Sequence, residues 1–209
     1  MIPPEKSEMD LQAAIHQLDQ IQNSLERSEC FRGYRSQSVA FSGLLGLAGV
    51  LLQTWLIPDP AASLQTWLGL WIGIAVVCVV VVAVEILVRC WRIRSRREFQ
   101  LTKTALRQLV PALFAGAILT HIISSTAPES AWMLPGLWSV LFGLGVFSSL
   151  PQMPDRFVWV ACWYVGGGLW LLMIGRGEAA LAPWMMLIFV IGQMLSALQL
   201  YLTLERPHV

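Results

Sequence analysis

Six long apolar stretches alternate with shorter polar segments along the chain. Each stretch has about 17 to 25 residues, the length that a helix needs to cross a hydrocarbon core of about 30 Å. A membrane-spanning barrel would instead show short segments of alternating polarity, so the pattern predicts helices. The predicted spans are 39–57, 64–88, 106–124, 132–150, 157–174 and 180–204.

The connections between the spans predict how the helices are arranged. Residues 58–63, 125–131 and 175–179 form connections too short to join anything but antiparallel neighbours. We therefore predict an all-α polytopic integral membrane protein, in which three antiparallel hairpins make one six-helix transmembrane domain over residues 39–209. Residues 1–38 are predicted to form a separate cytoplasmic segment, an amphipathic helix followed by a basic juxtamembrane stretch.

The predicted cytoplasmic helix runs from about residue 8 to residue 29. Ser7 and Asp10 resemble a capping box with Asp in the place of Glu. The polar face carries acids and amides but few cations, so it suits an anionic bilayer surface poorly. The apolar stripe, at spacings of three and four, is Leu11, Ile15, Leu18, Ile21 and Leu25. It predicts a protein partner or a coiled coil, and packing on the chain's own cytoplasmic loops is the alternative.

Basic residues gather on one side of the predicted spans. Of the 14 Lys and Arg residues, only Arg176 lies in a connection on the other side, which leaves 13. Short cytoplasmic loops carry such an excess, so both termini are predicted to be cytoplasmic. No cleavable signal peptide is expected, because the first apolar run is already long enough to span. Arg greatly outnumbers Lys, a bias that we associate with bacterial genomes, so the predicted location is the bacterial cytoplasmic membrane.

The net charge of +1 conceals this asymmetry, and the mean hydropathy of +0.62 agrees with spanning helices. Anionic headgroups attract each nearby basic side chain by about 1 kcal/mol. We therefore interpret the charge as membrane orientation and expect no nucleic acid partner. An acidic or phosphorylated partner at the Arg-rich connection 89–107 is the alternative. The arginines expected at lipid headgroups are Arg32, Arg35, Arg92, Arg94, Arg96 and Arg97.

Two ionisable side chains inside the spans are candidate functional residues, because a charge at the bilayer centre costs about 2.5 to 3.5 kcal/mol. Glu85 lies four residues before Arg89, which places both on one helix face. This spacing predicts a structural ion pair, and a proton-relay or ion site is the alternative. His121 is followed by hydroxyl residues, a pattern that predicts interhelical hydrogen bonds. A pH sensor or a metal ligand is the alternative there.

Small residues four apart recur in the spans and allow helix backbones to approach closely in lipid. We expect these pairs to hold the bundle together. A homodimer that uses one of the faces is the alternative; Gly69 and Gly73 are the fullest match, although such pairs are frequent by chance. Tryptophans open the helices that return toward the cytoplasm, at Trp67, Trp132 and Trp184. Interfacial aromatic belts explain these positions without any further role.

The chain lacks the residue patterns of an intramembrane enzyme. It contains no HExxH, no GxSxG and no pair of acids within the spans, and its connections are too short for a catalytic domain. The cysteines lack metal-ligand spacing, so no metal or cofactor is expected. The predicted function is non-enzymatic: a membrane anchor, regulatory or sensory subunit that presents its cytoplasmic helix and Arg-rich connection to a protein partner. A small transporter or channel for a small solute is the alternative.

Overall fold

The computed structural model describes residues 36–93, 96–154, 156–175 and 181–205, and within these ranges it contains helices and no strand. The long helices are α2 (Ser36–Leu56), α3 (Leu64–Ile93), α4 (Arg96–Thr126), α5 (Leu134–Ser149), α6 (Phe157–Ile174) and α7 (Leu187–Leu200). Short 3₁₀ turns form η1 (Pro128–Met133), η2 (Leu150–Gln152) and η4 (Pro183–Met186), and a π-helical turn, η5 (Tyr201–Glu205), follows α7. The predicted cytoplasmic helix lies outside the described residues.

Six helical segments are long and apolar enough to cross a membrane, as the sequence predicts. Each has 18 to 22 residues, with a mean hydropathy between 1.5 and 2.8. The segments are Ser36–Leu56, Leu64–Glu85, Arg107–Thr126, Pro128–Ser149, Phe157–Ile174 and Pro183–Thr203. The largest boundary difference is at the fourth segment, which begins at Pro128 and not at residue 132, because η1 runs directly into α5.

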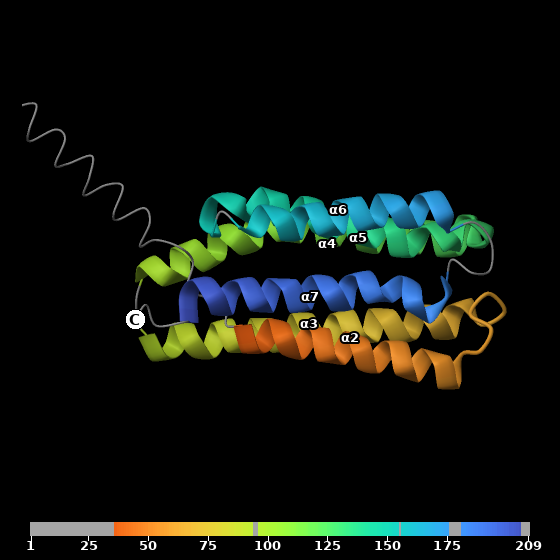
Figure 1. Cartoon of the computed structure of the whole chain (residues 1–209), viewed down its shortest axis with the longest axis horizontal. Helices are drawn as coiled ribbons and strands as arrows, with labels where there is room; N and C mark the ends of the chain where they lie inside the picture. The colour runs from red at the N-terminus through yellow and green to blue at the C-terminus, as the bar shows by residue number, and fades with distance from the viewer. Residues whose placement is uncertain (1–35, 94–95, 155, 176–180, 206–209) are drawn as a thin grey trace, which may run out of the picture.

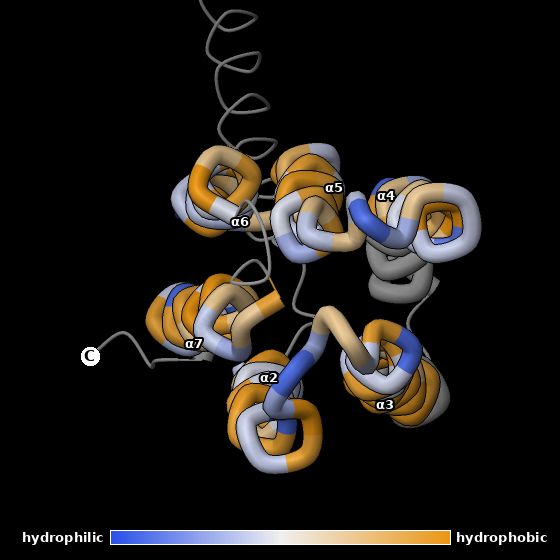
Figure 2. The backbone as a smooth tube through the Cα atoms, turned by 90° about the vertical axis from the view of Figure 1, so that its right-hand side faces the viewer, coloured by the Kyte–Doolittle hydropathy of each residue, from blue (hydrophilic) through white to orange (hydrophobic). Residues whose placement is uncertain are grey.

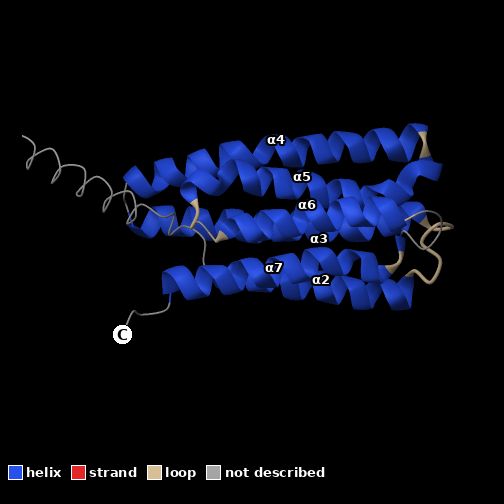
Figure 3. Ribbon diagram, turned by 45° about the horizontal axis from the view of Figure 1, so that its top comes forward, coloured by secondary structure: helices blue, strands red, loops and turns tan. Residues whose placement is uncertain are grey.

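The helices form two layers of three that run along one long axis (Figures 1 and 3). Viewed along this axis, α4, α5 and α6 make one layer, and α2, α3 and α7 make the other (Figure 2). The most extensive packing is between α5 and α6 and between α2 and α7, whereas α3 and α4 barely touch. The bundle is therefore built on two tight helix pairs, with α3 and α4 at its looser side.

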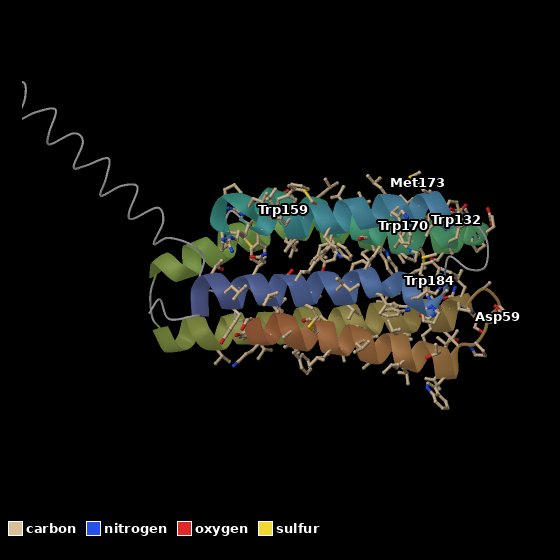
Figure 4. All side chains as sticks on the ribbon, in the orientation of Figure 1. Asp59, Trp132, Trp159, Trp170, Met173 and Trp184 are labelled. Carbon is tan, nitrogen blue, oxygen red and sulfur yellow. The ribbon has the colours of Figure 1, made fainter. Side chains whose placement is uncertain are left out.

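One end of the bundle holds the connections from α2 to α3, from α4 to α5 and from α6 to α7, and we call it the distal end. Asp59, Trp132 and Trp184 lie there (Figure 4). The opposite end, where α2 begins and η5 ends, is the proximal end. The two ends differ in composition, because the last turn of α3 and the first turn of α4, which contain Arg92, Arg96 and Arg97, belong to the proximal end.

The α5–α6 pair is held at short distance by small residues. A Cβ atom added to Gly168 would lie 2.7 Å from the backbone oxygen of Gly136, so a larger residue does not fit. Beside this contact, the fully buried Ser139 donates a hydrogen bond of 2.8 Å from its Oγ to the carbonyl oxygen of Tyr164. Close backbone packing of this kind, with a hydroxyl bond across it, is how helices associate in lipid.

The outer faces of the helices carry large apolar side chains. On α6, Trp159, Trp170 and Met173 project away from the bundle (Figure 4), with exposed fractions of 72%, 51% and 78%. Exposed apolar side chains also cover the free faces of α2, α3 and α4. A surface this apolar is expected against lipid tails and is rare on a monomer in water.

Candidate functional site

A buried hydrogen-bond relay ties three segments together at the distal end. Gln53 on α2 is 0% exposed, and its amide group is bonded at both ends. Its Nε2 donates to the carbonyl oxygen of Leu181 at 2.7 Å, and its Oε1 accepts from the indole Nε1 of Trp71 on α3 at 2.8 Å. Because a buried amide without partners is costly, this pairing fixes the segment before α7 against α2 and α3.

A second relay joins the two layers. Trp67 on α3 stacks on Trp138 on α5, with ring centroids 5.6 Å apart and ring planes 8° apart. The Nε1 of Trp138 donates to Thr120 Oγ1 on α4 at 2.8 Å. Trp67 is 0% exposed and its own indole nitrogen has no hydrogen-bond partner. The expectation that Trp67 sits in an interfacial belt is therefore wrong, since this ring is inside the bundle.

An aromatic cluster fills the middle of the bundle between α5, α6 and α7. Tyr164 contacts Phe142 edge-on at a centroid distance of 4.8 Å and lies 5.8 Å from Phe189. Trp163 donates from Nε1 to the carbonyl oxygen of Ile188 at 3.0 Å. This hydrogen bond joins α6 to α7, in addition to the ring contact between Tyr164 and Phe189. The cluster closes the interior with apolar rings and contains no charged side chain.

Glu85 is half-buried on α3, near the proximal end. Its carboxylate accepts a hydrogen bond from the hydroxyl of Ser38, near the start of α2. Ser42, one turn further along α2, donates to the carbonyl oxygen of Ser38 at 3.0 Å. The predicted ion pair with Arg89 stays a prediction, because the Arg89 side chain lies outside the described part of the structure. What the structure adds is the Ser38 contact, which joins two helices.

His121 lies on α4 near the distal end, and its side chain is exposed. The hydroxyl groups of Ser124 and Ser125 do not bond the imidazole; they donate to the backbone oxygen of His121, at 3.1 Å and 2.7 Å. Among the described residues the imidazole has no hydrogen-bond partner, so the predicted interhelical bond is not formed there. His121 and Glu85 lie toward opposite ends of the bundle and are not brought together.

Most other predicted site residues fall outside what can be described. The backbone of Arg92, Arg96 and Arg97 belongs to α3 and α4, but their side chains are outside the described residues. The remaining candidates lie wholly outside the described ranges: Leu11, Ile15, Leu18, Ile21, Leu25, Arg32, Arg35 and Arg94. These assignments stay predictions.

The distal end also contains a pocket of about 450 Å³, which the sequence did not suggest. Its walls come from all three distal connections: Ala61 and Leu64 at the start of α3, η1 with Glu129 and Trp132, and Leu181 before η4. The lining is mainly apolar, and Glu129 is the only charged residue in it. In the described ranges, no group of three or more His, Cys, Asp or Glu residues is placed to hold one metal ion.

The sequence contained partial signals for the distal relays. Gln53 is a polar residue inside an apolar span, and Trp67 and Trp71 lie four residues apart and therefore on one helix face. The pocket had no such signal, because its walls are brought together only by the packing of three separate connections.

Comparison with known proteins gives no relative from which a function could be transferred: no family model, no curated protein and no solved structure matches this chain. The function must therefore be argued from the residues themselves.

Proposed function

We propose that the chain is an integral, multi-pass protein of the bacterial cytoplasmic membrane, with both termini in the cytoplasm, that acts without catalysis. In this account the bundle is an anchor. The predicted helix at residues 8–29 and the Arg-rich connection 89–107 are presented to a cytoplasmic protein partner, and the arginines beside the membrane bind anionic headgroups.

The observation that carries the proposal is the use of the polar groups inside the spans. Gln53 and Thr120 are bonded to tryptophans of neighbouring helices, and Ser139 and Glu85 are bonded across helix pairs. These groups hold helices together, as polar residues commonly do in membrane bundles. Because these polar groups are used in helix packing, we assign partner binding to the two segments predicted from the sequence, residues 8–29 and 89–107.

The hairpin arrangement is part of the same proposal. Packing of α2 on α3, of α4 on α5 and of α6 on α7 supports three hairpins whose open ends face the cytoplasm. The cytoplasmic helix would then enter the membrane directly at α2, beside the contact between Ser38 and Glu85.

The test is an affinity capture of the full-length protein from its native host, with bound proteins identified by mass spectrometry. Leu18→Asp combined with Ile21→Asp places two charges in the apolar stripe and should abolish capture of the partner. Gln20→Asp combined with Asn23→Asp adds the same charge on the polar face and should retain it. A partner that binds the stripe variant as well as the unchanged protein would exclude the stripe as the interface.

A homodimer is a further proposal, supported by one glycine pair. A Cβ atom added to Gly69 or Gly73 would meet nothing within 4 Å, whereas Gly136, Gly143 and Gly168 each face a neighbouring helix closely. We propose that a second copy packs on this open face of α3. Gly69→Ile with Gly73→Ile should reduce the dimer fraction measured by light scattering, and Gly166→Ile, at another open position, should leave it unchanged. Equal dimer fractions in all three proteins would contradict the assignment.

A small-solute transporter is the second candidate function. Buried side-chain oxygens of Gln108 and Gln199 have no hydrogen-bond partner, and such groups can serve a polar solute. Solute flux into proteoliposomes distinguishes the two functions. Flux that Glu85→Gln or His121→Ala removes would favour transport, and its absence in the unchanged protein would favour the anchor.

A further inference from the structure

The pocket at the distal end is built from parts that are held in place independently of any ligand. Its lining combines the buried Ala131 and Leu181, which are 3% and 4% exposed, with the exposed Ala61 and Glu129. The volume of about 450 Å³ lies within the usual range of about 300 to 1,000 Å³ for small-molecule sites. The pocket is thus large enough for a compact organic ligand.

Hydrogen bonds fix two of its walls. The carboxylate of Asp59 accepts from the backbone N–H groups of Ala61 and Ala62, both at 3.1 Å, which caps the turn that carries Ala61. Gln53 holds the carbonyl oxygen of Leu181 at 2.7 Å, and Trp71 in turn holds Gln53. Preformed walls reduce the ordering cost of binding.

The third wall is η1, a turn of six residues that runs directly into α5. The N–H of Ser130 donates to the carbonyl oxygen of Ala127 at 2.8 Å, so the turn that carries Glu129 is closed by its own backbone. Trp132, three residues further, belongs to the same lining. An acidic residue and an aromatic residue therefore share one wall.

The charge of the distal end is one-sided in the described part of the chain. Its charged residues there are Asp59 and Glu129, both acids, and Asp59 already accepts two backbone hydrogen bonds. Among the residues that line the pocket, Glu129 is the one with a charge. An apolar cavity with one carboxylate and one indole matches a cation on an apolar body, since the carboxylate attracts the charge and the ring binds cations on its face.

We propose that this pocket binds an organic ammonium cation carrying an apolar group, with Glu129 opposite the charge and Trp132 beside it. Two sources supply this chemistry: a free alkyl- or arylammonium compound, and the ammonium headgroup of a phosphatidylethanolamine molecule at the membrane surface. The site lies at the end of the bundle opposite to the predicted partner-binding helix, so this inference does not depend on the proposed function.

The test for the free compound is a ligand-observed NMR titration of the full-length protein in a nonionic detergent. Benzyltrimethylammonium should bind, while benzyl alcohol and phenylacetate, which keep the apolar ring without the positive charge, should bind more weakly. Glu129→Gln should raise the Kd of benzyltrimethylammonium by about fivefold, as expected for the loss of one exposed charge pair. Ala61→Phe, which fills the mouth of the pocket from an exposed position, should also weaken it.

Asp59→Asn is the matched control. It removes one negative charge from the same end of the bundle and keeps the oxygen that caps Ala61, so binding should stay within about twofold of the unchanged protein. The lipid source is tested in parallel by native mass spectrometry, in which phosphatidylethanolamine should stay bound in preference to phosphatidylglycerol and should be lost from the Glu129→Gln protein.

Cation binding that depends on Glu129 supports the free compound, and lipid retention that depends on Glu129 supports the headgroup. Three results would overturn the proposal: neither ligand binds, Glu129→Gln has no effect on either, or Asp59→Asn weakens binding as much as Glu129→Gln. The last result would mean that the probe is attracted by surface charge and not held in the pocket.

Discussion

Trp67 of α3 and Trp138 of α5 lie almost parallel, with ring centroids 5.6 Å apart, and this stack connects the two helix layers near the distal end. A hydrogen bond between neighbouring helices lies on each side of the stack. Trp138 donates to Thr120 on α4, and one turn after Trp67 on α3, Trp71 donates to Gln53 on α2. The stack and these two hydrogen bonds thus join α2, α3, α4 and α5.

Replacing Trp67 by Ala should lower the free energy of unfolding by about 3 kcal/mol, because it removes the stack and leaves a cavity in a fully buried position. Trp159→Ala removes the same side chain from a position that is 72% exposed and should have little effect. The measurement is denaturant unfolding of both variants in detergent micelles. Equal losses would show that the stack does not stabilise the bundle.

Replacing Gln53 by Leu should lower the free energy of unfolding by about 1 to 3 kcal/mol. The substitution leaves the indole N–H of Trp71 and the carbonyl oxygen of Leu181 buried without their partner. Gln65→Leu, at an exposed position on α3, makes the same chemical change without breaking a described bond. Thermal unfolding of the two variants side by side checks the expectation. A Gln53→Leu protein as stable as the unchanged one would mean that the relay contributes nothing net.

Gly168→Ala should separate α5 from α6 and lower the free energy of unfolding by on the order of 1 to 3 kcal/mol, because the new Cβ would lie 2.7 Å from the backbone oxygen of Gly136. Gly166→Ala, two residues earlier on α6, meets nothing within 4 Å. It should be neutral or stabilising by up to about 1 kcal/mol, since Ala favours helices over Gly. If the two variants unfold alike, the close α5–α6 contact is not what holds this pair.

The spans themselves could be predicted from the sequence because they depend on local properties. Length and continuous apolar composition are enough to find a spanning helix, and prolines such as Pro58 and Pro128 mark the turns between helices. The observed span limits accordingly lie close to the predicted ones.

The packing of the helices could not be predicted in the same way. Lipid tails and a protein interior are equally apolar, so the inward face of a spanning helix has no polarity contrast that a sequence reveals. Trp67 shows the consequence: a tryptophan near a span end is typical of an interfacial belt, yet this one is buried and stacked. Side-by-side packing of α2 and α7 likewise joins the first and last spans, far apart in the sequence.

In the candidate site, too, the features that depend on local sequence could be predicted, and those that depend on helix packing could not. Glu85 was identified from its position inside a span, and its neighbour Arg89 from helical spacing, both of which are local. The Ser38 hydroxyl that bonds Glu85 lies 47 positions away in the chain and became visible only when α2 was placed on α3. The distal pocket is lined by residues of three separate connections, so it could not be predicted from any single stretch of the sequence.

The proposed cytoplasmic partner depends on the proposed orientation, with the proximal end in the cytoplasm and the distal end outside. Side-specific labelling of single-cysteine variants with a membrane-impermeant maleimide in intact and permeabilised cells tests this most directly. We expect Ser63→Cys, Ser130→Cys and Gly177→Cys to react in intact cells, and Cys30 to react only after permeabilisation. The reverse pattern, or reaction of all four positions from one side, would contradict the account.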